Sequence, residues 1–268
     1  MDIGQQFRAL HVRGRPFVLA NAWDAGSAKM LAALGAQAIA TSSAAHAFTL
    51  GRGDGGTISR DEALAHAQGL VAAVSLPVQG DFENGFGDDP DTCAATVRLA
   101  AEVGLAGICI EDTVLPSDAP YDFDLAVERI RAACAAARAL PRDFVLTARA
   151  DGVLTGRYDL AEAIRRLQAF EAAGADCLYA PLIPTLEGIT QVCAATTAPV
   201  NVLIAGLTTR HSLTDYAGMG VARLSLGSSL ARITHRAIHD AATEMFGAGR
   251  FDLLGRGIAG SQVDALLK

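Results

Sequence analysis

The sequence lacks several features that mark particular classes of protein. It has no run or stripe of lysine and arginine, and its formal net charge is −7, which disfavours a nucleic-acid-binding surface. No apolar run is long enough to span a bilayer, and the opening residues MDIGQQFRAL contain no apolar signal region. The five cysteines include no CxxC pair, which is typical of small buried residues in a reducing compartment. We therefore expect a cytoplasmic protein with no nucleic-acid partner and no membrane partner.

Common catalytic motifs are missing as well. No G-x-S-x-G elbow is present, so Ser-His-Asp catalysis has no support. The six histidines show no HxH or HExxH spacing, and His235 and His239 are expected on the solvated face of the last outer helix. One match to the dinucleotide pattern, Gly51-x-Gly53-x-x-Gly56, neither directly follows a predicted strand nor precedes an acidic residue at the expected distance. A dinucleotide-dependent oxidoreductase is therefore the weakest alternative.

What the chain does contain is a regular alternation of short apolar runs and alanine-rich helical segments. Half of the 268 residues are apolar, which is enough for one large core. The apolar runs are nearly continuous, as strands covered on both faces must be; they begin near Phe17, Ala38, Pro77, Gly107, Phe144, Cys177, Val200 and Arg223. Eight strand–helix pairs predict one α/β domain over residues 1–268, a (β/α)8 TIM-type barrel, with an open doubly wound sheet as the alternative. Residues 247–268 are expected to form an extra helical tail outside the barrel.

Acidic side chains follow two neighbouring predicted strands, at the rim where barrel enzymes carry their active sites. Asp81 and Glu83 are two residues apart on one strand, so both side chains should leave the same face. Glu111 ends the next strand. Three carboxylates this close repel and take up protons unless a cation neutralises them, and oxygen ligands suit Mg²⁺, with Mn²⁺ as a substitute. The sequence thus predicts a magnesium site; helix capping or an arginine partner is the alternative for any one carboxylate.

Other polar residues at the same rim are candidates for binding substrate. Arg149 ends the fifth strand and can hold a carboxylate by two hydrogen bonds, the alternative being a structural ion pair. Ser42 and Ser43 end the second strand and offer N–H groups and hydroxyls, the alternative being ordinary turn chemistry. We add Ala44 beside them and Asn201 near the end of the seventh strand. These residues form the predicted substrate-binding set.

Two segments are long for connections in a barrel, and long loops in compact domains tend to be functional. The first, AAHAFTLGRGDGGTIS, follows the serine pair and contains His46. The second, TVLPSDAPYDF, follows the Glu111 strand, contains Asp118 and Tyr121, and could act as a gate over the barrel mouth. His46, Asp118 and Tyr121 are therefore the candidate acid or base groups, and ordinary surface loops are the alternative interpretation.

At these positions the sequence resembles the isocitrate lyase/phosphoenolpyruvate (PEP) mutase superfamily. The matching stretches occur in the right order over most of the first 160 residues; they are NAWDAGSAKMLAALGAQAIATSS, LGRGD, PVQGDFENGFGDDP, GLAGICIEDT and FVLTARADGVLTG. The resemblance implies a (β/α)8 barrel that forms a homo-oligomer, usually a tetramer built as a dimer of dimers, with the C-terminal tail exchanged between subunits. It also implies Mg²⁺ and a small 2-oxo or 2-hydroxy acid in which a C–C or P–C bond is broken or moved.

The resemblance further implies roles for individual residues. Asp81 is the expected main metal ligand, and Glu83, Glu111 and Asp54 are expected to hold metal-bound waters. The serine pair is expected to bind the substrate carboxylate, with Arg149 assisting. These roles overlap with the set reached from the strand ends alone, and Asp54 is the addition.

The chain also departs from the superfamily pattern. Isocitrate and methylisocitrate lyases carry a K-[KR]-C-G-H gating loop, whereas this chain has TVLPSDAPYD, with neither cysteine nor lysine. The lysine and asparagine that mutase-like enzymes use in that loop are not evident either. Ala40 replaces an aromatic residue before the serine pair, and Pro181 replaces an acidic residue or histidine at the end of strand six.

We therefore predict a Mg²⁺-dependent lyase that cleaves a C–C bond in a small 2-oxo or 2-hydroxy di- or tricarboxylic acid through a metal-stabilised enolate. Oxaloacetate decarboxylase-like and methylisocitrate or isocitrate lyase-like reactions both fit. The alternatives are a phosphonopyruvate/PEP mutase-type enzyme and a catalytically weak 2-oxo-acid binding protein.

Overall fold

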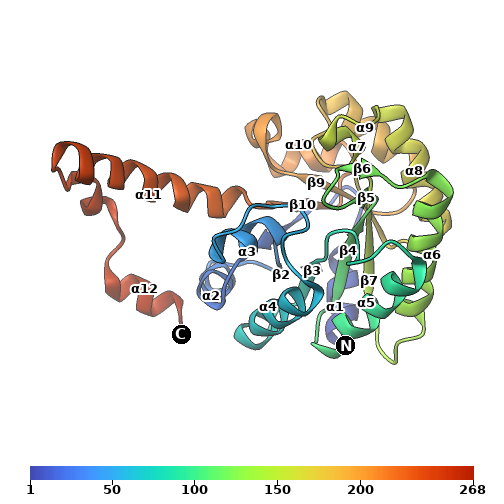
Figure 1. Cartoon of the computed structure of the whole chain (residues 1–268), viewed down its shortest axis with the longest axis horizontal. Coiled ribbons are helices and arrows are strands. Elements are labelled where there is room, and N and C mark those ends of the chain that lie inside the picture. The colour runs from blue at the N-terminus through green and yellow to red at the C-terminus, as the bar shows by residue number, and fades with distance from the viewer.

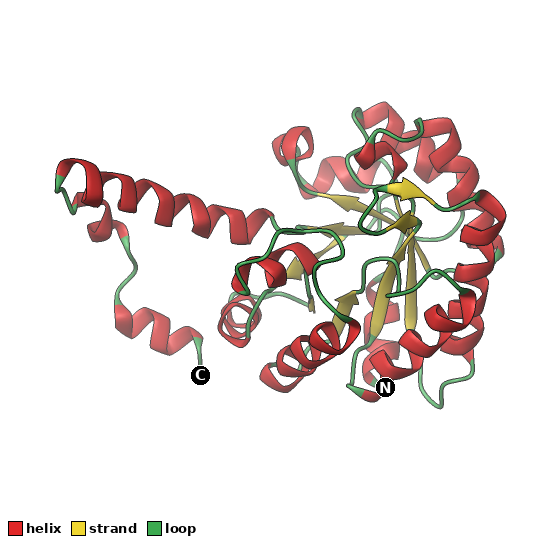
Figure 2. Ribbon diagram, viewed as in Figure 1, coloured by secondary structure: helices red, strands yellow, loops and turns green.

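A closed barrel of eight parallel strands forms the centre of the molecule in the computed structural model, which describes residues 1–268 (Figures 1 and 2). Its strands are β1 (Phe17–Asn21), β2 (Ala38–Ala40), β3 (Val78–Asp81), β4 (Gly107–Glu111), β7 (Val145–Arg149), β8 (Cys177–Tyr179), β9 (Val200–Leu203) and β10 (Arg223–Ser225). All eight predicted strands are present, each beginning within one residue of its expected position. Because β1 pairs with both β2 and β10, the sheet has no free edge. The barrel prediction is confirmed, and the open sheet is excluded.

Helices surround the barrel and follow the strands in turn (Figure 2). They are α1 (Ile3–Leu10), α2 (Ala25–Ala33), α3 (Ser43–Thr49), α4 (Arg60–Ala73), α5 (Pro90–Glu102), α6 (Phe123–Arg138), α7 (Gly152–Thr155), α8 (Leu160–Ala172), α9 (Leu186–Ala195), α10 (Leu213–Gly218), α11 (Ser229–Ala248) and α12 (Gly260–Leu266), with 3-10 turns η1 (Gly206–Arg210) and η2 (Asp252–Arg256). Local sequence sets many of their starts. Ser59 and Glu62 form a capping box at α4, and Asp89 caps α5 ahead of Pro90. None of the helices combines the length and the hydrophobicity that a membrane span requires.

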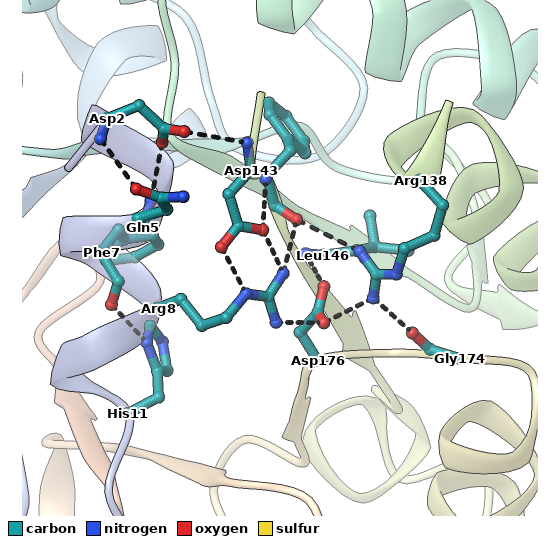
Figure 3. Close-up of polar contacts among 11 residues, drawn as sticks. Asp2, Gln5, Phe7, Arg8, His11, Arg138, Asp143, Leu146, Gly174 and Asp176 are labelled. Carbon is teal, nitrogen blue, oxygen red and sulfur yellow. Dashed lines mark hydrogen bonds and ion pairs between the residues drawn. The ribbon is translucent and has the colours of Figure 1, made fainter. Parts of the chain in front are cut away.

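Helix α1 closes the N-terminal end of the barrel. Phe7 of α1 is fully buried and packs with Phe17 and Leu19 of β1. Arg8 on the same helix donates to Asp143, with Nε 2.7 Å from Oδ2, and to Asp176, with Nη1 2.5 Å from Oδ1 (Figure 3). Both carboxylates lie just before barrel strands, so these ion pairs tie α1 to the strand starts. The contacts at this end of the barrel therefore stabilise the fold, as is usual for (β/α)8 barrels. The active site is expected at the opposite, C-terminal rim.

The chain leaves the barrel earlier than predicted. The expected tail began at Gly247, but α11 already extends away from the barrel from Ser229, and α12 then returns toward α2 (Figure 1). Lys29 Nζ of α2 donates to the carbonyl of Leu267 at 3.1 Å. Apolar side chains along this extension are exposed, including Ile233 and Phe246. The predicted boundary was late because the helical periodicity of the eighth barrel helix continues without a break into the projecting segment.

The predicted gating segment is a short hairpin. Strands β5 (Thr113–Val114) and β6 (Ala119–Pro120) pair antiparallel directly after the Glu111 strand. Asp118 occupies the turn with a positive φ of 57°. The hairpin thus holds its turn residues over the C-terminal rim.

Candidate active site

The predicted rim residues surround a cavity of about 280 Å³ at the C-terminal ends of the strands. Loops after β2, β3, β4 and β7 supply its polar wall, and residues after β8, β9 and β10 supply the remainder. The predicted site residues that line this cavity are Ser42, Ser43, Ala44, Asp54, Asp81, Glu83, Glu111, Asp118 and Arg149. The structure therefore brings together nine of the twelve residues that the sequence proposed.

Asp81 is the last residue of β3 and is held from two sides. Its backbone N–H donates to Thr41 Oγ1 at 2.7 Å, and its carboxylate Oδ2 accepts from both the N–H and the hydroxyl of Ser43, each at 2.9 Å. The other oxygen, Oδ1, faces Arg149 Nη1 at 3.8 Å. Ser43 was predicted to bind the substrate carboxylate, but its donors are occupied by Asp81. Ser42 likewise uses its hydroxyl to cap α3, accepting from Ala45 N at 3.2 Å.

Glu83 reaches the cavity for a different reason from the one predicted. Strand β3 ends at Asp81, and Glu83 follows it in the left-handed region with φ 45°, so strand alternation does not relate the two side chains. The residue is 5% exposed, and its carboxylate accepts from Gly56 N at 3.1 Å. Burial raises the pKa of Glu83 to about 7, and the nearby charges of Asp81 and Asp54 add to this increase.

Glu111 and Arg149 are direct register partners on the adjacent strands β4 and β7. Arg149 Nη1 lies 3.0 Å from Glu111 Oε2, and the Nε–Nη2 edge of Arg149 forms a two-point pair with Asp151, with Nη2 2.7 Å from Oδ2. The structural ion pair that was the alternative for Arg149 therefore exists. The guanidinium edge that was expected to bind a substrate carboxylate binds Asp151 instead. Burial raises the pKa of Asp151 to about 6, with the guanidinium opposing the increase. Only the Nη1 edge of Arg149 faces Asp81 and Glu111.

Two further carboxylates come from loops. Asp54 lies in the glycine-rich segment after α3 and accepts from the N–H of Gly55 at 2.9 Å. Burial raises the pKa of Asp54, and repulsion from Asp81 adds to it. Asp118 contributes from the turn of the β5–β6 hairpin. The cavity thus contains six carboxylates and two arginines, an excess of negative charge that leaves several carboxyl groups short of compensation.

The structure corrects the form of the predicted metal site. No three His, Cys, Asp or Glu side chains have the spacing of a directly coordinated ion. The carboxylates of Asp81, Glu83 and Glu111 each contact a protein partner, Ser43, Gly56 and Arg149 respectively, and they do not form one three-carboxylate ligand set. The donors are nevertheless all oxygen and overcrowded with negative charge, which fits a hard cation that keeps several waters. The expectation that Asp81 is the main protein ligand and that the other acids hold metal-bound waters is compatible with this arrangement.

His46 lies outside the cavity, contrary to its predicted role as an acid or base. Its ring stacks on His66 with 3.8 Å between centroids, and His66 Nε2 lies 2.9 Å from the carbonyl of Trp23. His46 Nδ1 is buried without a partner. Burial lowers the pKa of both imidazoles, to about 4 for His66. Both rings line a separate small cavity of about 10 Å³, which Asp81 and Glu83 also border.

Tyr121 was also predicted as an acid or base and lies outside the cavity. Its hydroxyl donates to Asp88 Oδ1 at 2.6 Å and accepts from Asn84 Nδ2 at 2.9 Å. The Arg129 guanidinium lies 3.9 Å from the ring centroid. Tyr121 is therefore a buried packing residue that fixes the loop after β3, because the chain turns back toward α6 directly after β6.

Asn201, predicted to bind substrate, lies inside the barrel and below its mouth. It is the second residue of β9, is 1% exposed, and donates from Nδ2 to Ser225 Oγ at 2.8 Å. Its Oδ1 accepts from Arg223 Nε at 2.8 Å. The strand extends to Leu203, so the predicted strand end was two residues early. Leu203 lines the cavity in its place.

The sequence also left several cavity residues unassigned; they are Thr113, Asp151, Thr155, Tyr179, Ser228, Ser229 and Arg232. Asp151 carried a signal, because it follows Arg149 at the same strand end. The sequence contained no signal for Arg232, because this residue lies at the start of a long helical segment. The spacing of apolar residues in that segment predicts an ordinary outer helix. The position of Arg232 became visible only when β10 was placed in the barrel.

The closed barrel and the acid-rich cavity at its C-terminal rim define an enzyme of the (β/α)8 class. The family model described as phosphoenolpyruvate phosphomutase matches residues 7–246. The chain therefore belongs to the phosphoenolpyruvate phosphomutase family, and it is an enzyme of the isocitrate lyase/PEP mutase type. The resemblance inferred from the strand-end motifs is confirmed.

Known proteins of similar sequence and structure include lyases. A crystal structure from Burkholderia cenocepacia, provisionally described as a lyase/mutase, has 48% identity and a TM-score of 0.93, covering 98% of this chain and 94% of that one. The 2-methylisocitrate lyase of Escherichia coli is 32% identical over 74% of this chain and 68% of its own length. An oxaloacetate decarboxylase of Pseudomonas savastanoi pv. phaseolicola is 30% identical over 82% of this chain and 76% of its own length.

Proposed function

We propose that this chain is a Mg²⁺-dependent lyase that cleaves a carbon–carbon bond in a small 2-oxo or 2-hydroxy acid. The observation that carries the proposal is the crowding of Asp54, Asp81, Glu83 and Glu111 around one cavity whose charge is not balanced by arginine. Such a cluster favours a divalent cation over an empty site. The lyases among the relatives support the same type of reaction.

The residues present leave few other routes to C–C cleavage. The chain has two lysines, Lys29 and Lys268, and neither lines the cavity, so no lysine is placed to form a Schiff base with a 2-oxo substrate. All five cysteines are buried, and none lines the cavity. Stabilisation of the carbanion-like charge would therefore come from a cation that the acid-rich wall holds.

A bound Mg²⁺, held by Asp81 and by waters on Glu83, Glu111 and Asp54, would supply Lewis-acid polarisation of the oxygen next to the substrate carboxylate. Ser43 fixes the Asp81 carboxylate by two hydrogen bonds, and Arg149 holds Glu111 close by. Both contacts reduce the movement of the acidic wall. The Nη1 edge of Arg149, which contacts Glu111 and faces Asp81, also borders this space.

Cleavage of a 2-hydroxy acid needs a base and an acid. The base takes the hydroxyl proton, the C–C electron pair passes to the departing carbon, and that carbon then gains a proton. Among the predicted acid–base candidates, Asp118 alone lines the cavity, from a hairpin turn above the rim. Asp118 is therefore our candidate for the base. Decarboxylation of a β-keto acid needs no base for its first step, and the same wall accommodates it.

The test is a magnesium-dependent product screen. Oxaloacetate, 2-methylisocitrate, isocitrate, 2,3-dimethylmalate and phosphonopyruvate are each offered to the protein, and release or loss of 2-oxo acid is followed with Mg²⁺ and with EDTA. We expect one of the four substrates that contain no phosphorus to turn over with Mg²⁺ but not with EDTA. The Asp81→Ala variant should lose that turnover, and Asp91→Ala, at an exposed site in the first turn of α5, should retain it. Full activity in Asp81→Ala would refute the mechanism.

The screen also separates the alternatives. Turnover confined to phosphonopyruvate would favour a mutase-type enzyme. Tight binding of 2-oxo acids without turnover would favour a binding protein.

We extend the proposal to a cytoplasmic homo-oligomer. Five unpaired cysteines suit a reducing compartment, and the exposed apolar residues of α11, such as Ile233 and Ile238, suit burial against another subunit.

A further inference from the structure

We propose that Arg232 binds a second carboxylate of the substrate and so selects dicarboxylic over monocarboxylic acids. This inference rests on the proposed function, because it assigns one more contact to the substrate of the same cavity. Arg232 lies in the first turn of α11, which begins at Ser229 shortly after the end of β10, and it lines the cavity. No feature of the sequence motifs pointed to it.

The first observation is the difference between the two arginines of the cavity. Arg149 is surrounded by carboxylates and pairs with Asp151 and Glu111. The Arg232 side chain makes no ion pair and no hydrogen bond with any other residue. By contrast Arg236, one turn further along α11, pairs with Asp240 at 2.7 Å. Arg232 is therefore an exposed cation at the cavity wall that still has all its donors free for an anion.

The second observation is where this cation lies. The strands close in the order β1, β10, β9, β8, β7, β4, β3, β2, so β10 is four strands from β4 in either direction. Arg232 follows β10, whereas Glu111 ends β4 and Asp81 ends the neighbouring β3. The arginine thus enters the mouth from the side opposite the acidic wall. A substrate anchored by one carboxylate and its neighbouring oxygen at that wall presents its far end to Arg232.

The third observation is the wall between these two sides. Leu182 follows β8, Leu203 ends β9 and Leu226 follows β10, and each lines the cavity. Leu182 is 40% exposed, with a positive φ of 54°. Leucine side chains offer no hydrogen bonds, so this part of the cavity suits the carbon chain between two polar ends. Across the cavity, the acidic wall, the leucines and the free arginine follow one another in space. This order matches the first carboxylate, the carbon chain and the second carboxylate of a dicarboxylic acid.

Calorimetry with two acids of equal carbon number tests the proposal. In 2-oxoglutarate the fifth carbon is a carboxylate, and in 2-oxopentanoate it is a methyl group. With Mg²⁺ present, we expect the unmodified protein to bind 2-oxoglutarate at least about tenfold more tightly, as a charge-assisted pair allows. Arg232→Gln should remove this preference by weakening 2-oxoglutarate alone, Arg232→Lys should retain part of it, and the control Arg236→Gln should leave it unchanged.

Oxalate separates the possible failures, because its two carboxylates are adjacent and are too short to extend from the acidic wall to Arg232. If oxalate does not bind with Mg²⁺, the proposed function and this inference both fail. If oxalate binds but the unmodified protein shows no preference between the longer acids, the inference alone is refuted. Equal weakening of both longer acids in Arg232→Gln would also refute it, since that outcome assigns Arg232 to the shape of the cavity.

Discussion

Replacing Glu83 with glutamine should stabilise the metal-free protein at high pH. The pKa of Glu83 rises from its ordinary value of 4.5 to about 7, first through burial and then through repulsion from Asp81 and Asp54. Because the folded-state pKa lies above the unfolded one, the neutral carboxyl favours the fold. Its contribution is complete below about pH 4.5 and is lost as the pH rises through 7.

The size of the effect follows from the same shift. A difference of this size corresponds to about 3 kcal/mol of unfolding free energy at pH 8 and about 1 kcal/mol at pH 5. Glutamine is neutral at both pH values and can still accept the hydrogen bond from Gly56 N. Glu83→Gln should therefore raise the Tm of the protein in EDTA by about 6–12 °C at pH 8, and much less at pH 5, taking roughly 2–4 °C per kcal/mol.

Thermal denaturation followed by circular dichroism, at pH 5 and pH 8 and with EDTA or Mg²⁺, provides the assay. Glu187→Gln is the matched control, because Glu187 is an exposed residue in the first turn of α9. Mg²⁺ should raise the Tm of the unmodified protein more than that of Glu83→Gln, since the cation neutralises the charge that glutamine lacks. If the Tm of Glu83→Gln equals that of the unmodified protein at pH 8 in EDTA, the ionised carboxylate of Glu83 does not destabilise the metal-free fold and the reasoning is refuted.

Two further substitutions separate the chemistry of the rim from its packing. Arg149→Lys keeps the positive charge but loses the two-point pair with Asp151, so we expect kcat/KM to fall about 100-fold or more with an unchanged circular dichroism spectrum; a loss below threefold would contradict the positioning role of Arg149. Tyr121→Phe leaves Asp88 and Asn84 without their shared hydroxyl, so urea denaturation should show a loss of about 1–2 kcal/mol while kcat/KM stays within about threefold. A large loss of activity in a fully stable Tyr121→Phe would place this residue in the reaction after all.

The sequence was most informative where the chemistry coincides with a strand end. Asp81, Glu111 and Arg149 are the last residues of β3, β4 and β7, and each of them lines the cavity as expected. Strand ends are predictable because an apolar run covered on both faces stops where polar residues begin, and the parallel barrel brings those points to one rim.

Predictions failed where a loop path decided the outcome. His46, Asp118 and Tyr121 all lie in connections that follow barrel strands, yet only Asp118 lines the cavity. The side chains of His46 and Tyr121 contact partners distant in sequence, His66 and Asp88 respectively. No local pattern encodes such partners, because the contacts form only when helices and loops pack on the closed barrel.

The amino-acid sequence by itself determined the eight strand–helix pairs and the acidic residues at the strand ends, because these depend on periodicity and on the burial of strands by helices. It left an open sheet as the alternative to the barrel, and the pairing of β1 with both β2 and β10 decided between them. Only the tertiary structure decided which charges meet. The pairing of β4 with β7 placed Arg149 in register with Glu111, and closure of the barrel brought Arg232 from the opposite side to the same cavity. Charge pairing depends on distance in space, and ring closure sets that distance between residues that the chain keeps far apart.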